Sequence, residues 1–258
     1  MTYGKGSING TKITDDVNIA GLTLPNHPFG VANQETVDFT NASFDGLMGS
    51  ALSTLSQEKV LTPVESLHKQ GLIQTATISY KLSRLRDEEN DGEVTFGGLD
   101  PSKFDQDTQV TVDNVSPIGF WEANMDAVTM NGQQLAVASK TVILDTGTTL
   151  TVWPAKDAAI LHQAIPGAKD DGNGGFTIPC QTNVSLALTF GGNSFSIDPT
   201  DLTFLPVDPN DPQGDCLSAI TSGDVGGPTV SLLGDVFLKN AYFSTNVDTN
   251  TITLARLK

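Results

Sequence analysis

The chain has 258 residues, enough to bury the core of one large domain or two smaller ones. It carries 30 acidic against 14 basic residues, and this net charge of −16 repels nucleic acid and anionic membranes. No apolar run approaches the length of about eighteen residues that spans a bilayer. The residues after Met1 form neither a basic n-region nor an apolar h-region, so no export signal is readable. We therefore expect neither nucleic acid nor membrane as a partner.

The scattered acidic residues have two readings of about equal weight. One is an ordinary solvated surface, to which the charged run 86–92 and the Asp- and Pro-rich loop 206–214 also belong. The other is an adaptation to acid, because a protein with few bases gains little positive charge when its carboxylates are protonated.

Short segments of alternating polarity, bounded by Gly, Asn, Asp or Pro, recur along the chain and predict β-strands. In chain order they are residues 77–82, 94–96, 110–112, 186–190, 194–197 and 251–254. Asn131-Gly132 and Gly191-Gly192 lie between apolar flanks and predict tight hairpin turns. The pattern as a whole predicts an all-β protein built from sheets and hairpins.

Helical signals are few and short. The clearest predicted helix begins at Thr62, which forms a capping box with Glu65, and ends at Gly71. Further short helices are predicted after Pro154 and after Gly234. The histidines on the first two of these helices are read as surface or satisfied side chains rather than as catalytic ones.

Cys180 and Cys216 are the two cysteines, and neither lies in a Cys-x-x-Cys motif. The three histidines show no zinc-binding spacing, so we expect no metal site. The residues leave two alternatives open for the cysteines, one disulfide or two buried thiols. Asn-x-Ser/Thr sequons occur at Asn9, Asn41, Asn114 and Asn183. The sequon at Asn114 is followed by proline, which is a poor acceptor context.

Asp145 is the residue that carries the strongest chemical signal. The β-branched and apolar run 142–144 predicts a buried strand that delivers Asp145 to a turn at Gly147. A carboxylate at the end of a buried strand is costly unless it is hydrogen-bonded. The backbone amides of the turn and the hydroxyl groups of Thr148 and Thr149 can supply those bonds.

The run 143–149 resembles the active-site loop of pepsin-like aspartic proteases, in the copy that belongs to their C-terminal lobe. Other segments resemble elements of the same family in the same order along the chain. They are the flap hairpin (Tyr3-Gly4-Lys5-Gly6-Ser7), the hydrophobic-hydrophobic-Gly elements of the two lobes (44–49 and 231–237) and the aromatic pair that opens the C-terminal lobe (Phe120-Trp121). The resemblance covers essentially the whole chain and is strongest to fungal secreted members.

The resemblance implies a bilobal, all-β, double-ψ β-barrel architecture with an incomplete N-terminal lobe (residues 1–110) and a C-terminal lobe (residues 111–258). It assigns Asp145 as catalytic, Cys180–Cys216 as a disulfide, and no cofactor. The implied substrate-binding residues are Tyr3, Gly4, Lys5, Gly6, Phe44, Phe120, Gly147, Thr148 and Thr149.

The implied activity is hydrolysis of peptide bonds at acidic pH by two aspartates and an activated water. The expected partners are protein or peptide substrates and statine-type inhibitors, and the expected state is a secreted, glycosylated monomer. The sequence contains one Asp-Thr-Gly and begins at the flap, so we expect the first catalytic aspartate to lie outside it. Asp45 and Asp235 are not favoured as substitutes.

Three hypotheses follow from the single Asp-Thr-Gly. The protein is part of an acid endopeptidase, or it is an inactive relative that binds peptides, or it is an enzyme rebuilt by dimerisation. The dimer is least favoured, because the remaining N-terminal lobe would obstruct a symmetric pairing. We expect this chain alone to show little activity and to aggregate or to unfold first in its N-terminal lobe.

Overall fold

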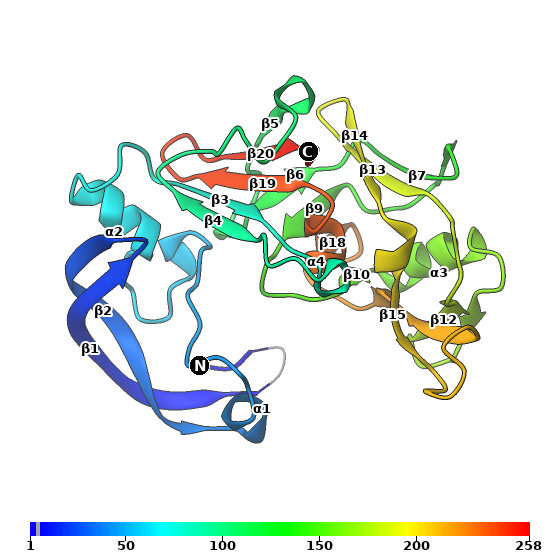
Figure 1. The fold of residues 1–258 in the computed structure, drawn as a ribbon, viewed down its shortest axis with the longest axis horizontal. Helices are drawn as coiled ribbons and strands as arrows, with labels where there is room; N and C mark the ends of the chain where they lie inside the picture. Colours follow the sequence, from blue (N-terminus) through cyan, green and yellow to red (C-terminus); the bar gives the residue numbers. More distant parts are fainter. Residues whose placement is uncertain (4–5) are drawn as a thin grey trace.

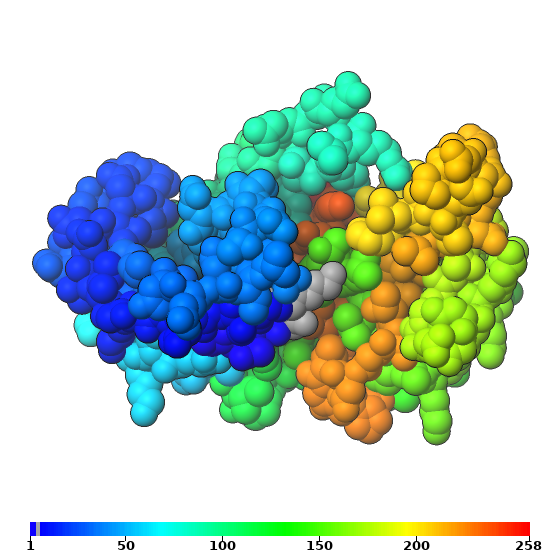
Figure 2. All heavy atoms as spheres, turned by 90° about the horizontal axis from the view of Figure 1, so that it is seen from below, coloured from blue at the N-terminus to red at the C-terminus, as the bar shows by residue number. Residues whose placement is uncertain are grey.

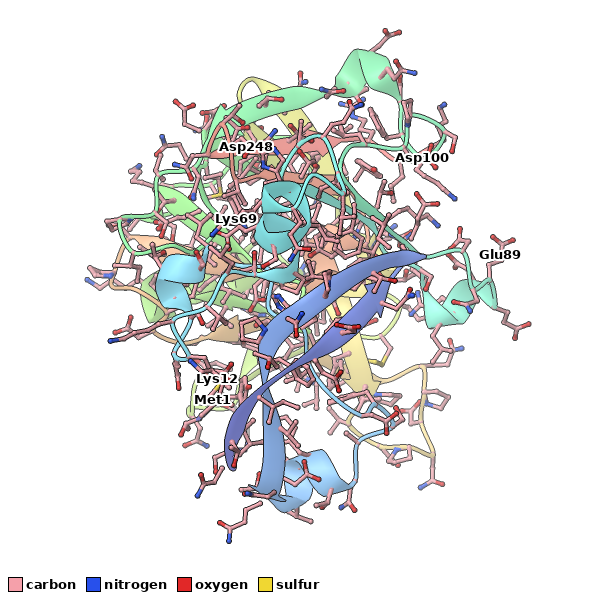
Figure 3. All side chains as sticks on the ribbon, turned by 90° about the vertical axis from the view of Figure 1, so that its left-hand side faces the viewer. Met1, Lys12, Lys69, Glu89, Asp100 and Asp248 are labelled. Atoms are coloured by element: carbon pink, nitrogen blue, oxygen red, sulfur yellow. A yellow bond between two sulfur atoms is a disulfide. The ribbon has the colours of Figure 1, made fainter. Side chains whose placement is uncertain are left out.

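The structure is a computed structural model that describes residues 1–3 and 6–258. It is an all-β protein, as the sequence predicts, and its strands form several separate sheets (Figure 1). A long hairpin near the N-terminus forms an arm at one end, and the remaining sheets form the body (Figure 1). Figure 3, in which the arm faces the viewer, shows the acidic side chains of Glu89 and Asp100 pointing outward at the periphery.

The arm consists of strands β1 (Ile8–Ile19) and β2 (Leu22–Glu35), which pair in antiparallel fashion. Ala20 and Gly21 form the turn with φ values of 50° and 79°, the left-handed region that a tight hairpin turn requires. Most of its side chains are exposed, and Leu24 and His27 are the buried ones. Within the described residues no third strand pairs with this hairpin. The hairpin was not among the predicted strands.

A five-stranded sheet joins three strands from residues 77–113 to β19 and β20, in the order β4-β3-β19-β20-β5. Its strands are β3 (Thr77–Lys81), β4 (Glu93–Phe96), β5 (Val110–Asp113), β19 (Tyr242–Asn246) and β20 (Thr251–Ala255). This confirms the strands predicted at residues 77–82, 94–96, 110–112 and 251–254. Ser79 of β3 lies opposite Ser244 of β19, and their hydroxyl groups are hydrogen-bonded at 2.7 Å. Strands from both sides of the predicted lobe boundary at residue 110 therefore share one sheet.

A second five-stranded sheet, ordered β17-β10-β18-β9-β6, positions the candidate site. Its strands are β6 (Glu122–Asn124), β9 (Thr141–Leu144), β10 (Thr151–Trp153), β17 (Ile220–Ser222) and β18 (Val230–Leu233). β18 is parallel to β9 and antiparallel to β10. It therefore lies between the two strands that flank the Asp145 loop.

Two four-stranded sheets complete the C-terminal part, in the orders β14-β13-β7-β8 and β11-β12-β16-β15. The first contains β7 (Ala127–Met130), β8 (Gln133–Gln134), β13 (Leu186–Phe190) and β14 (Asn193–Ile197), and the second contains β11 (Lys169–Asp170), β12 (Phe176–Pro179), β15 (Thr203–Pro206) and β16 (Asp215–Ser218). The predicted turns at Asn131-Gly132 and Gly191-Gly192 are confirmed, because each connects two paired strands. A disulfide joins Cys180 to Cys216 beside the second sheet. Closing that loop stabilises the fold by about 3–4 kcal/mol in the chain-entropy model.

The helices are short. They are α1 (Val37–Thr40), α2 (Pro63–Lys69), α3 (Ala155–Gln163) and α4 (Asp235–Leu238), with 3₁₀ helices at Ser53–Leu55, Leu85–Asp87, Gln106–Thr108 and Pro199–Leu202. The capping box of α2 is confirmed, with Thr62 and Glu65 bonded to each other's backbone amides. Within the described part of the chain no helix is long and apolar enough to cross a membrane.

The two helical histidines are satisfied, as predicted. Nδ1 of His68 on α2 lies 3.1 Å from Oδ1 of Asp248. His162 of α3 is buried, bonds the carbonyl of Ala158 and the hydroxyl of Ser218 through its two ring nitrogens, and stacks on Phe176. Both ring nitrogens of His162 are therefore engaged, as is one of the two of His68.

Candidate active site

Asp145 stands at the carboxyl end of β9, and its backbone is fixed on both sides. The amide of Leu144 donates to the carbonyl of Trp121 at 2.9 Å, and the amide of Asp145 donates to the carbonyl of Leu233 at 3.1 Å. The indole of Trp121 is buried and donates to the carbonyl of Ser50 at 2.8 Å. The strand that delivers Asp145 is therefore anchored to β18 and, through Trp121, to the N-terminal part of the chain.

The carboxylate of Asp145 accepts two short hydrogen bonds from its own loop. The amide of Gly147 donates to Oδ1 at 2.9 Å, and the hydroxyl of Thr148 donates to Oδ2 at 2.6 Å. A Cβ at position 147 would lie 3.1 Å from Oδ1, so a side chain there would crowd the carboxylate. These bonds stabilise the anion and fix the direction in which its oxygens point.

Gly234 lets a second segment approach the Asp145 loop closely. A Cβ on this residue would lie 2.1 Å from the carbonyl oxygen of Thr148 and 2.5 Å from that of Leu150, which is sterically impossible. The following amides of α4 use this proximity: that of Asp235 donates to the Thr148 carbonyl at 2.8 Å, and that of Val236 to the Thr149 carbonyl at 3.1 Å. The first turn of α4 therefore holds the loop that carries Asp145.

Asp235 brings a second carboxyl group close to the Asp145 carboxylate. The pKa of Asp235 is raised to about 6, chiefly by burial; the positive charge of Lys239 opposes this shift, and the negative charge of Asp145 adds to it. Its Oδ1 is buried without a hydrogen-bond partner in the described residues. The sequence interpretation set Asp235 aside because it belongs to another element. The signal that would have found it is its position directly after Gly234, within the second hydrophobic-hydrophobic-Gly element (231–237).

Residues on the two sides of the predicted flap tip pair with each other. Thr2 bridges to Ser7, and the amide of Tyr3 donates to the carbonyl of Gly6 at 3.0 Å. The ring of Tyr3 packs edge-on against Phe39 at 5.4 Å between centroids. Predicted residues Gly4 and Lys5 lie outside the described residues.

The remaining predicted residues differ in how closely they approach Asp145. Gly147 and Thr148 bind it directly, whereas Thr149 meets α4 through its carbonyl only. Phe120 is half-buried next to Trp121. Phe44 is 50% exposed, and residues 44–49 form no strand in the structure.

Seen from below, the blue N-terminal part and the yellow-to-orange part of the chain lie on either side of a hollow, with green residues visible in it (Figure 2).

No group of three or more His, Cys, Asp or Glu side chains in the described residues is placed to hold a metal ion. What the site offers chemically is a fixed carboxylate at the end of a strand, able to accept a proton from a bound water.

The eukaryotic aspartyl protease family model matches residues 1–257. The chain belongs to this family. It is 37% identical over its whole length to the probable aspartic-type endopeptidase CTSD of Arthroderma benhamiae, of which it covers 49%. It is also 35% identical to rhizopuspepsin of Rhizopus chinensis, over 94% of this chain and 60% of that protein. The probable vacuolar protease A of Trichophyton verrucosum is 32% identical over all of the chain and 64% of its own length.

The chain therefore spans about half to two thirds of the length of these relatives. Its membership in the aspartyl protease family agrees with the all-β fold and with the Asp-Thr-Gly at the end of β9. The CTSD relative is named as a probable aspartic-type endopeptidase, and the matching family is one of proteases, so the chain belongs to an enzyme family.

Proposed function

We propose that this protein is an aspartic endopeptidase that hydrolyses peptide bonds at acidic pH, with Asp145 as one of its two catalytic aspartates. The observation that carries the proposal is the pair of hydrogen bonds that Gly147 and Thr148 donate to the Asp145 carboxylate at the end of β9. They hold the group in one orientation, which general acid-base catalysis requires.

The reaction needs a second carboxyl group beside Asp145. Two carboxylates that share one site cannot both ionise readily, so one acts as base and activates a water while the other protonates the carbonyl oxygen. The sequence contains a single Asp-Thr-Gly, and the chain covers 49% of the first relative. We propose that the second aspartate belongs to a part of the protein outside these 258 residues.

The substrates we propose are proteins and peptides with bulky apolar side chains beside the scissile bond. Tyr3, Phe44 and Phe120 are the proposed pocket walls, because each is an aromatic side chain that is exposed or half-buried. Statine-type inhibitors are the proposed ligands of the same cleft. The proposed setting is fungal and secretory, where the disulfide persists and the sequons are used, and the proposed state is a monomer.

Cleavage of a denatured globin at about pH 4, with and without a statine-type inhibitor, tests the proposal. The full-length gene product is expected to cleave it, and both Asp145→Asn and the inhibitor are expected to abolish cleavage. The 258-residue chain alone is expected to show little activity. A full-length protein that binds the inhibitor without cleaving would instead indicate a peptide-binding module. Inhibitor-sensitive cleavage by the short chain that depends on Asp145 would favour the dimer.

A further inference from the structure

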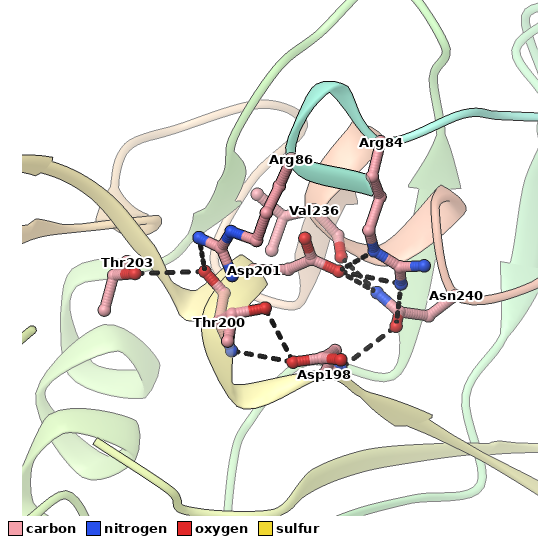
Figure 4. Close-up of polar contacts among 8 residues, drawn as sticks. All are labelled: Arg84, Arg86, Asp198, Thr200, Asp201, Thr203, Val236 and Asn240. Carbon is pink, nitrogen blue, oxygen red and sulfur yellow. Dashed lines mark hydrogen bonds and ion pairs between the residues drawn. The ribbon is translucent and has the colours of Figure 1, made fainter. Parts of the chain in front are cut away.

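Arg84 connects the N-terminal part of the chain to the helix that holds the Asp145 loop. It follows β3, and its guanidinium reaches two residues that lie far away in the sequence (Figure 4). Nε donates to Asp201 Oδ2 at 3.0 Å, Nη2 lies 2.9 Å from the same oxygen, and Nη2 also donates to Asn240 Oδ1 at 2.6 Å. The Arg84 and Asp201 side chains are 22% and 8% exposed, so water screens this contact little.

Asn240 connects the Arg84–Asp201 pair to α4. Its Nδ2 donates to Asp201 Oδ2 at 2.9 Å and to the carbonyl of Val236 at 2.9 Å, while its Oδ1 also accepts the amide of Asp198 at 3.0 Å (Figure 4). Both donors and the acceptor of the side-chain amide are therefore used. Loss of the Arg84 guanidinium would leave Asp201, a nearly buried anion, with the Asn240 amide as a remaining partner.

The other side of the same short helix meets the candidate site. Val236, whose carbonyl accepts Asn240, donates its own amide to the carbonyl of Thr149. One helical turn thus lies between the residues that Arg84 contacts and the loop that carries Asp145. A helix of four residues has little rigidity of its own, so its position depends on such flanking contacts.

We propose that Arg84 is a positioning residue for Asp145, which it acts on through Asn240, Asp201 and the first turn of α4. The effect of this positioning on catalysis rests on the proposed function. The nearby Arg86 is exposed and donates one hydrogen bond within the described residues, to the carbonyl of Thr200 at 3.4 Å. Arg86→Met therefore provides a matched control that removes the same kind of side chain from the same segment.

Amide hydrogen exchange in the full-length protein tests the proposal directly. Arg84→Met is expected to speed exchange of the Asp235 and Val236 amides by about tenfold, the factor that follows from losing a charge-assisted hydrogen bond. Exchange of Ile78 and Tyr80 in β3 is expected to stay unchanged, because a local loss leaves that sheet intact. Arg84→Lys, which keeps the charge without the fork of donors, is expected to give an intermediate effect. Arg86→Met is expected to leave all four amides unchanged.

Equal acceleration of the α4 and β3 amides would mean that Arg84 supports only global stability, and the proposal would fail. So would equal exchange in Arg84→Met and Arg86→Met. In the globin assay, Arg84→Met is expected to lower kcat by about tenfold with KM within about twofold, since a misplaced catalytic group weakens transition-state binding. A protein that cleaves nothing contradicts the proposed function, whereas the exchange result still decides the role of Arg84.

Discussion

The carboxyl group of Asp235 lies close enough to Asp145 for the charge of Asp145 to raise its pKa. Burial is the largest cause, Lys239 opposes it, and the net effect brings the pKa of Asp235 to about 6 from an ordinary 3.8. The two groups come from opposite ends of the C-terminal part and meet because Gly234 permits close contact with the Asp145 loop. A carboxyl group of this kind changes its charge in the range between neutral and acidic pH.

Asp235→Asn is expected to change how stability depends on pH. Above about pH 6 the folded protein bears the cost of an ionised, partly buried carboxylate. As the pH falls from about 6 to about 4, the folded state takes up the proton before the unfolded state, so this cost disappears. The variant should therefore be more stable than the wild type at pH 7.5 by about 1 kcal/mol, a value discounted for partial exposure.

Urea denaturation at several pH values measures this difference, which should vanish near pH 3.5. Asp113→Asn, at an exposed position on β5, is the control and should give no pH-dependent difference. Parallel stability curves for wild type and Asp235→Asn would contradict the assignment.

Thr148→Val is expected to destabilise the Asp145 loop, because it removes the hydroxyl that donates to Asp145 Oδ2 and keeps the shape of the side chain. The loss of a hydrogen bond to a charged group costs about 1.5–3 kcal/mol. Thr149→Val is the matched control, since the exposed hydroxyl of Thr149 makes no hydrogen bond within the described residues. Chemical denaturation at neutral pH compares the two, and equal losses would show that the bond contributes nothing specific.

The arm formed by β1 and β2 is expected to make the isolated chain self-associate. Its edges are unpaired within the described residues, and Ile13 and Val31 are 36% and 44% exposed on neighbouring positions. Replacing both by threonine should lower light scattering without lowering the melting temperature, because neither side chain is buried. As a contrast, Val142→Thr, at a fully buried position of β9, should lower the free energy of unfolding by about 1–3 kcal/mol. Unchanged scattering in the double variant would show that association uses another surface.

Glycan occupancy is expected to differ between the sequons. Asn41 and Asn183 are exposed, whereas Asn114 is 7% exposed and its Nδ2, the atom that would carry the glycan, donates to Asn250 Oδ1 at 2.9 Å. Expression through a secretory pathway should therefore give glycan at the first two and none at Asn114. Peptide mapping by mass spectrometry measures this. A glycan at Asn114 would mean that modification precedes folding of that segment.

The elements that sequence reasoning predicted are those whose causes are local. The capping box at Thr62, the turn at Asn131-Gly132 and the strand before Asp145 each follow from a few adjacent residues. The β1–β2 arm was missed because its strands carry few apolar residues in alternation and include Pro25 and Pro28.

Contacts between distant segments could not be predicted from such patterns. The approach of Asp235 to Asp145 depends on β18 inserting between β9 and β10, and the reach of Arg84 to Asn240 spans 156 positions. Nothing near Arg84 in the sequence distinguishes it from Arg86, although the structure gives them different partners. The catalytic role of Asp145 remains a prediction, supported by its hydrogen bonds and by the family.

The five-stranded sheet that joins β3, β4 and β5 to β19 and β20 limits when its strands can pair during synthesis. Strands β19 and β20 leave the ribosome long after β3, β4 and β5, yet β19 pairs with β3 and β20 with β5. The β3–β4 pair and β5 must therefore wait for their β19 and β20 neighbours while the residues between are made. Such non-local pairing predicts slow folding and a period in which the nascent polypeptide depends on chaperones.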